Sequence, residues 1–225
     1  MSLTPRETAR RNTLKRIRTI GFRQLDEGGP EALNLRAIAR ELGIVASGMY
    51  RYVPDRNALV TLLIVDAYED LARAVREADD VHAGPRTRLH ALVATMRGWA
   101  LDHPRRWALI YGTPLPEYQA PPEQTLAPGT AVAVLFLHLA AQSDLQPSTL
   151  DDPPAPLKSE FAAIADEQGV DVSPAILERA IEAWISVLGL INAEAFGYLG
   201  TAPFSDFDAV AKRIVDRIGD SLGLS

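Results

Sequence analysis

Apolar residues recur along the chain at intervals of three and four positions, the spacing that places side chains on one face of an α-helix. Two-residue alternation rich in Val, Ile and Thr, which would indicate strands, is absent. The sequence therefore predicts an all-α protein. Helices are expected over residues 4–28, 35–42, 46–52, 56–78, 86–102, 105–110, 130–142, 157–168, 173–199 and 205–222.

Five residues have the side chains and positions of helix N-caps. Their oxygen atoms can accept the unpaired backbone N–H groups of a first helical turn. The first cap is followed by Pro and, three residues later, by Glu, which is the pattern of a capping box. The predicted caps are Thr4, Asn34, Asp55, Ser173 and Ser205.

Proline-rich stretches interrupt the helical pattern twice. Residues 111–128 contain five prolines and are expected to form a long ordered loop or a lid, and Gln146–Pro156 is expected to be a second break. Between the two stretches, residues 130–142 are almost wholly apolar, which predicts a helix buried on all sides.

The last two predicted helices, 173–199 and 205–222, carry more apolar residues than a monomer surface would hold. Antiparallel pairing across a twofold axis would cover them, so we expect a homodimer formed through these two helices. The alternative is that they cover the apolar helix at 130–142 within one chain.

The net charge of −6 is unevenly distributed along the sequence. Residues 1–60 hold 11 Lys and Arg against six Asp and Glu, a balance of +5, whereas residues 61–225 hold 12 against 23, a balance of −11. Six of the N-terminal basic residues lie in the first half of the first helix: Arg6, Arg10, Arg11, Lys15, Arg16 and Arg18. This asymmetry predicts a polyanionic partner at the N-terminal end only.

The composition excludes several classes of protein. The sequence has no Cys, which excludes disulfides and Cys-ligated metals and is typical of a reducing compartment. No apolar run approaches 18 residues, and the Arg-rich N-terminus is not followed by an apolar segment. We therefore expect a cytoplasmic protein that is not exported and has no membrane partner.

Residues 34–59, NLRAIARELGIVASGMYRYVPDRNAL, have the pattern of a helix-turn-helix. Two short helices flank Gly43, which permits the left-handed turn between them. The second helix is rich in polar and aromatic residues that a core would not need, as expected of a helix that lies in the DNA major groove.

This stretch resembles the DNA-binding region of the tetracycline-repressor (TetR) family of transcriptional regulators. The matching segments are Leu35–Ala39, Leu42-Gly43, Tyr50–Val53 and Arg56–Leu59. Three positions depart from the family pattern: Tyr52 replaces the usual His, Val45 replaces a capping Ser, and Gly48 lies inside the recognition helix. These departures concern which DNA sequence is chosen.

The resemblance implies roles in DNA binding for particular residues. Arg36 would contact phosphate or a base edge, Arg51 would donate two hydrogen bonds to guanine, and Arg56 would contact phosphate. Tyr50 and Tyr52 would place hydroxyls on phosphates. The full predicted set is Arg36, Ala46, Ser47, Gly48, Tyr50, Arg51, Tyr52 and Arg56.

The middle of the chain resembles the effector domain of a TetR subgroup named for a Trp-His-Gly signature, through Trp99, His103-Pro104 and Trp107–Gly112. Aromatic and polar residues there and beyond are candidates for an effector pocket: Tyr68, Trp99, His103, Trp107, Tyr111, Phe136, His138 and Trp184. For each of them, core packing is the alternative. As a set they predict a small, apolar or weakly polar effector.

The sequence lacks the common motifs of phosphate-binding loops, zinc proteases and serine hydrolases, and its four His residues are scattered. We therefore expect no enzyme activity, no cofactor and no metal. The predicted function is an effector-responsive regulator, most simply a repressor, that binds palindromic double-stranded operator DNA as a homodimer. Residues 1–58 would form its DNA-binding domain and residues 59–225 its effector and dimerisation domain. The alternatives are a helical small-molecule-binding protein without DNA-binding activity and a scaffold protein.

Overall fold

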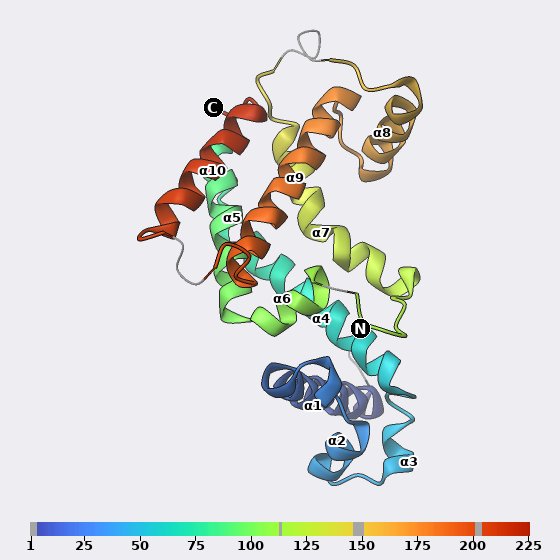
Figure 1. The fold of residues 1–225 in the computed structure, drawn as a ribbon. Helices are drawn as coiled ribbons and strands as arrows, with labels where there is room; N and C mark the ends of the chain where they lie inside the picture. The colour runs from blue at the N-terminus through green and yellow to red at the C-terminus, as the bar shows by residue number, and fades with distance from the viewer. Residues whose placement is uncertain (1–3, 113, 146–150, 201–203) are drawn as a thin grey trace. The chain divides into compact units, whose positions relative to one another are not determined.

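The computed structural model describes residues 4–112, 114–145, 151–200 and 204–225. Within these residues the protein is all-α, as predicted, with ten α-helices, one 3-10 helix and no strand (Figure 1). The elements are α1 (Pro5–Gly28), η1 (Pro30–Ala32), α2 (Leu35–Leu42), α3 (Ala46–Met49), α4 (Arg56–Ala78), α5 (Pro85–Asp102), α6 (Pro104–Tyr111), α7 (Pro122–Ala140), α8 (Ala155–Gln168), α9 (Pro174–Ala195) and α10 (Phe207–Ser221).

The chain divides into two compact units. The first comprises Met1–Asp70 and His103–Gly129, and the second comprises Leu71–Asp102 and Thr130–Ser225. The first unit therefore adds α6 and the segment that follows it to the N-terminal helices. The functional boundary that the sequence suggests after residue 58 stays a prediction.

The core of the first unit is built from α1, α2, α3 and the N-terminal half of α4. Ile17, Leu25, Ile38, Leu59 and Leu63 are fully buried there. Leu109 and Ile110 of α6 pack against the same cluster. Helices α1 to α3 form the blue part of the ribbon in Figure 1.

Four of the five predicted N-caps are confirmed. Thr4 and Glu7 form the complete capping box, and Asn34 accepts from the backbone N–H of Ala37 at 3.0 Å. Asp55 accepts from Ala58 N–H at 2.7 Å, and Ser173 accepts from Ile176 N–H at 3.3 Å.

The fifth cap and two helix ends differ from the prediction. Asp206, not Ser205, caps α10, and its carboxylate accepts from Ala209 N–H at 2.9 Å. Helix α9 ends at Ala195 rather than Leu199, because Gly197 takes a left-handed conformation with φ of 67°. Helix α3 ends at Met49, although turns continue through Tyr52, and its cap Val45 makes no side-chain hydrogen bond.

Helix α7 begins earlier and is less buried than predicted. It starts at Pro122, where proline suits the first helical position, and it continues through Pro128. Val132, Phe136 and Leu139 are buried on one face, whereas Leu126 and His138 are exposed. The expected loop over residues 111–128 is therefore shorter, and burial of this helix on all sides was a wrong prediction.

The second predicted break, Gln146–Pro156, lies partly outside the described residues, because these exclude 146–150. Its described end leads into α8, which begins at Ala155 rather than Leu157.

The second unit packs α5 against α9 and α10, which lie side by side in Figure 1. Two arginines of α5 connect these elements. Arg97 donates to Glu194 of α9 and forms an ion pair with Asp208 of α10 at 2.6 Å. Arg86 donates to the backbone carbonyls of Asp216 and Leu224 at 3.1 and 3.0 Å.

Among the described helices, none combines the length and apolar character that a membrane crossing requires.

Candidate nucleic-acid interface and ligand pocket

Helices α2 and α3 form a helix-turn-helix with one buried face. Gly43 ends α2 in the left-handed region, with φ of 69°, and Ile44 N–H donates to Ala39 carbonyl at 3.0 Å. Ile38, Leu42 and Met49 are buried on the inner face. The opposite face of both helices is therefore free to meet a partner.

The predicted DNA-binding residues lie mainly on this outer face. Arg36, Ala46, Ser47, Tyr50 and Arg51 are exposed, whereas Gly48, Tyr52 and Arg56 are half-buried. The sequence pattern identifies Val45 only as a residue that replaces a capping Ser. It is 72% exposed at the start of α3, which places an apolar side chain on the same surface.

A hollow of about 780 Å³, here called the head groove, lies between the start of α1 and the recognition helix. Three arginines, from α1 and from the turn after α3, contribute to its wall. Its lining residues are Arg6, Ala9, Arg10, Ile44, Val45, Gly48, Arg51 and Tyr52. A concave surface lined by guanidinium groups favours a phosphate backbone.

Arg10 also contacts the turn that follows α3. Its guanidinium carbon lies 5.4 Å from the centroid of the Tyr52 ring, and its Nη1 donates to the Arg51 carbonyl at 3.5 Å. The spacing of Arg6 and Arg10, one helical turn apart, was a signal that could have added them to the predicted site residues.

Arg56 has partners within the protein. Its Nη2 donates to the Pro30 carbonyl at 2.8 Å and lies 3.8 Å from a Glu31 carboxylate oxygen. The side chain therefore ties the start of α4 to η1, and a phosphate contact would be an additional role.

Arg18 differs from the other basic residues of α1. Its Nε lies 2.7 Å from an Asp66 carboxylate oxygen on α4, and both side chains are largely buried. Burial raises the pKa of Asp66 to about 6, the Arg18 charge partly offsets this rise, and the neighbouring Glu69 and Asp70 add to it. Arg18 thus links α1 to α4, and a phosphate contact would have to compete with this ion pair.

Helix α6 is attached to α1 through one arginine. The guanidinium carbon of Arg106 lies 4.3 Å from the centroid of the Phe22 ring, and Nη2 pairs with Asp26 at 2.6 Å. This contact is stacked and charge-assisted at once, which makes it directional.

The eight predicted pocket residues fall into separate groups. Tyr68, Trp107 and Tyr111 form one aromatic cluster in the first unit, with ring centroids 5.7 Å apart for the two tyrosines and 4.6 Å apart for Trp107 and Tyr111. Tyr68 also donates to the Ile110 carbonyl at 2.9 Å. Burial raises the pKa of both tyrosines in this cluster.

The remaining residues have different surroundings. Phe136 and Trp184 contact each other in the second unit, with centroids 5.3 Å apart. Trp99 is buried on α5, and His103 immediately precedes α6. His138 is exposed on α7, so an interior position for it was a wrong prediction.

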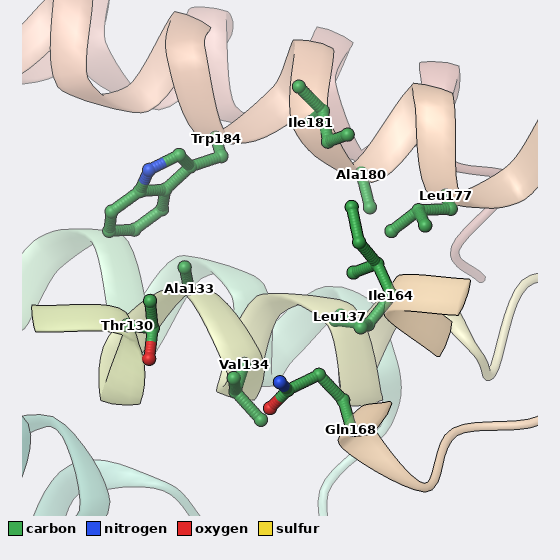
Figure 2. Close-up of a pocket in the computed structure, with 10 residues that line it drawn as sticks. All are labelled: Thr130, Ala133, Val134, Leu137, Ile164, Gln168, Leu177, Ala180, Ile181 and Trp184. Atoms are coloured by element: carbon green, nitrogen blue, oxygen red, sulfur yellow. The ribbon is translucent and has the colours of Figure 1, made fainter. Parts of the chain in front are cut away.

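A pocket of about 210 Å³ lies in the second unit between α7, α8 and α9. Its lining residues are drawn in Figure 2: Thr130, Ala133, Val134, Leu137, Ile164, Gln168, Leu177, Ala180, Ile181 and Trp184. Trp184 is the member of this lining that the sequence predicted. The others carry aliphatic or small polar side chains that do not stand out from ordinary helix residues.

Comparisons with known proteins agree with this architecture. Residues 89–218 match a family model described as the tetracyclin repressor-like C-terminal domain. An HTH-type transcriptional regulator of Mycobacterium tuberculosis (strain ATCC 25618 / H37Rv) is 40% identical over 220 residues, which cover 93% of this chain and 94% of the relative. A regulator of the same description from Mycobacterium bovis matches to the same extent.

Solved structures show the same fold. The crystal structure of SCO4313, a protein proposed to be regulatory, has a TM-score of 0.76 and 28% sequence identity, and the match covers 96% of this chain and 98% of that one. A bacterial regulatory protein in the tetR family from Rhodococcus RHA1 has a TM-score of 0.58 and 16% identity, with 95% and 98% covered.

Proposed function

Because the chain belongs to the TetR family of transcriptional regulators, we propose that it binds operator DNA through its helix-turn-helix and releases that DNA when a small molecule binds. The DNA-bound protein would act as a repressor, and the effector would relieve the repression. The subgroup with the Trp-His-Gly signature is part of this proposal, because Trp99, His103 and Trp107–Gly112 carry that pattern.

The head groove is the observation that carries the proposal. Arg6 and Arg10 of α1 line it together with Arg51, so phosphate-binding and base-reading groups share one concave surface. A surface that only keeps a protein soluble would instead carry positive and negative side chains interspersed. The three guanidinium groups can neutralise a phosphate strand that runs along the groove.

Within this interface the residues take different roles. Arg51 is exposed and reads guanine in the major groove, and Arg36 contacts phosphate or a base edge. Ala46, Ser47 and Gly48 allow close approach, and the hydroxyls of Tyr50 and Tyr52 fix the register on the backbone. Arg6 and Arg10 supply affinity that does not depend on sequence.

Homodimerisation completes the site, because two DNA-binding domains, here called the heads, are needed to read the two halves of a palindrome. Two half-sites would then lie about 34–36 Å apart, or a multiple of that spacing. The dimer forms through α9 and α10. The exposed side of α9 supports this proposal, since Ile185 is 62% exposed there.

An apolar or weakly polar effector shifts the dimer toward a state that does not bind DNA. The continuous helix α4, Arg56–Ala78, is the element whose movement would change the separation of the heads. The strength of induction equals the difference in effector affinity between the two states. Crystal structures with and without effector should differ in head separation, and an unchanged separation would overturn this mechanism.

An electrophoretic shift assay with DNA from upstream of the gene tests the DNA-binding proposal. Arg51→Ala should relax the preference for the operator, whereas Arg6→Ala should weaken binding to all duplexes evenly and lower the salt slope by about 1. Lys158→Ala, which removes one positive charge on α8, serves as the matched control and should change neither property. A wild-type protein that fails to shift its upstream DNA would favour a small-molecule-binding protein without DNA-binding activity.

A further inference from the structure

The pocket between α7, α8 and α9 has a lining without charge. Among the ten described residues that form it, eight carry aliphatic or aromatic side chains, and the two polar ones are Thr130 and Gln168. Leu137, Leu177 and Ala180 are buried, so the inner wall is apolar. An ionic ligand group would lose its hydration here without gaining a charged partner.

The volume of the pocket sets how much of a ligand it can enclose. About 210 Å³ is less than the roughly 300–1,000 Å³ of sites for drug-sized molecules. It equals the liquid volume of roughly seven waters. Packed to the density of a protein interior, the space holds an organic molecule of roughly eight to ten non-hydrogen atoms.

One end of the pocket differs from the rest. Ile164 and Gln168 of α8 are one helical turn apart, and both are in partial contact with solvent, Ile164 being 41% exposed. The Gln168 amide can both donate and accept hydrogen bonds. In Figure 2 its side chain extends from α8 among the apolar side chains of the lining. The polar end of a ligand would therefore lie at α8, with its apolar body against Leu137, Leu177 and Trp184.

We propose that this pocket is the effector site and that it takes an uncharged, mainly aliphatic molecule of roughly eight to ten non-hydrogen atoms with one terminal hydroxyl, carbonyl or amide group. The inference rests on the proposed function, because it names the chemical class of the effector which that function requires. It also assigns Gln168 as the residue that selects a neutral polar end.

Three eight-carbon probes that differ in one terminal group test the ligand class: 1-octanol, octanoate and octylammonium. Isothermal titration of the full-length protein should show saturable binding of 1-octanol with a stoichiometry of one per chain. Octanoate and octylammonium should bind at least about 10-fold more weakly, because the charged group of each loses part of its hydration at α8 without gaining a charged partner. Equal affinities for the three probes, or no binding of 1-octanol, would overturn the proposal.

Substitutions of Gln168 test the assignment of the polar end. Gln168→Lys should raise the affinity for octanoate at least about 10-fold over the wild-type protein and weaken octylammonium further, because it places a cation at the mouth of the pocket. Gln168→Leu should weaken 1-octanol by about 3- to 10-fold, the loss of one hydrogen bond. Gln168 is half-buried near the end of α8, so these variants should fold. Unchanged preferences would show that Gln168 does not face the ligand.

Two matched Ala→Phe substitutions test where the probe binds. Ala133 lies in the pocket lining, and Ala133→Phe should fill the space and weaken 1-octanol at least about 10-fold. Ala163 is exposed on α8 and lies outside the lining, so Ala163→Phe should leave binding unchanged. Equal effects of the two substitutions would mean that the probe binds elsewhere.

The same preparations in the DNA shift assay separate this inference from the proposed function. If unliganded protein does not bind DNA but 1-octanol still binds as described, the proposed function fails and the ligand class of the pocket stands. If DNA binds and 1-octanol occupies the pocket without releasing it, the effector assignment is overturned.

Discussion

Arg51 and Arg56 are five positions apart, yet their guanidinium groups have different surroundings. Arg51 is exposed beside the head groove, whereas Arg56 donates to the Pro30 carbonyl at 2.8 Å and is half-buried. Only Arg56 therefore has an identified role within the folded protein. A pattern of residue types along the chain cannot distinguish the two, because the partner of Arg56 is a backbone oxygen 26 positions earlier.

Arg56→Ala should lower the free energy of unfolding by about 1–2 kcal/mol, because it removes a charge-assisted hydrogen bond to a part-buried carbonyl. Urea denaturation monitored by circular dichroism measures this change. Arg51→Ala is the matched control and should stay within about 0.5 kcal/mol of the wild-type value. If the two variants unfold at the same urea concentration, Arg56 does not stabilise the junction of η1 and α4.

Asp66 should make stability depend on pH. Its pKa is raised to about 6 in the folded protein by burial, above its ordinary unfolded value, so the folded state binds the proton more tightly. The contribution of Asp66 to the free energy of unfolding is fully present below about pH 4 and is lost as the pH rises through 6. Urea midpoints at pH 4, 5, 6 and 7 should show this loss in the wild-type protein, whereas Asp66→Asn should remove this component.

At the scale of elements, the recognition helix α3 is the shortest α-helix in the described part of the chain. It has four helical residues, its cap Val45 makes no side-chain hydrogen bond, and Gly48 lies within it. Glycine inside a helix costs about 1 kcal/mol relative to alanine. The helix is therefore held mainly by the burial of Met49 and by its packing on α2.

Val45→Ser should stabilise α3 by about 0.5–1 kcal/mol, because serine can accept a backbone N–H of the first turn. Thermal unfolding measures the gain. The same substitution removes an exposed apolar side chain from the head groove, so a change in operator preference without a change in the salt slope is expected if Val45 contacts a base. Val81→Ser, at another highly exposed valine, should alter neither stability nor DNA binding.

Local signals in the sequence were sufficient for most of the elements. Thr4 with Glu7, Asn34, Asp55 and Ser173 act on backbone groups within three residues, so their positions alone predict the caps. Pro128 was misleading, because the burial of Val132 and Phe136 on the same helix outweighs its local cost. That burial depends on tertiary packing, which the neighbours of Pro128 in the sequence do not reveal.

The two candidate sites differ in how far the sequence could predict them. The helix-turn-helix is a contiguous stretch, so its exposed residues follow from one amphipathic pattern. The pocket in Figure 2 combines side chains of α7, α8 and α9 that are ordinary in type, and only their meeting in space makes them a site. Tyr68, Trp107 and Tyr111 pack against one another in the first unit and do not line this pocket, so their place in an effector site stays a prediction.

At the scale of the whole molecule, assembly decides whether two heads act together. The exposed surface of α9 includes Ile185, which is 62% exposed, with Ser186 and Gly189 also exposed nearby. A second copy packed across a twofold axis would cover this apolar side chain.

Ile185→Glu should shift the protein from dimer to monomer, because it places unpaired charges on both sides of the interface. Sedimentation velocity at several protein concentrations measures the shift, and operator affinity should fall with it. Leu157→Glu, at a partly exposed leucine of α8, is the matched control and should leave the protein dimeric. Dimers that persist in Ile185→Glu would exclude this surface as the interface.

The contact of Arg106 with Phe22 and Asp26 bears on how regulators of this kind can be recombined. A chimera that joins residues 1–58 to the effector domain of another regulator leaves the Phe22 ring and the Asp26 carboxylate without their guanidinium partner. Such a graft should unfold at a lower temperature than one that also transplants residues 103–129. The portable module of this protein is therefore discontinuous in sequence, and an exchange of recognition specificity must carry two segments at once.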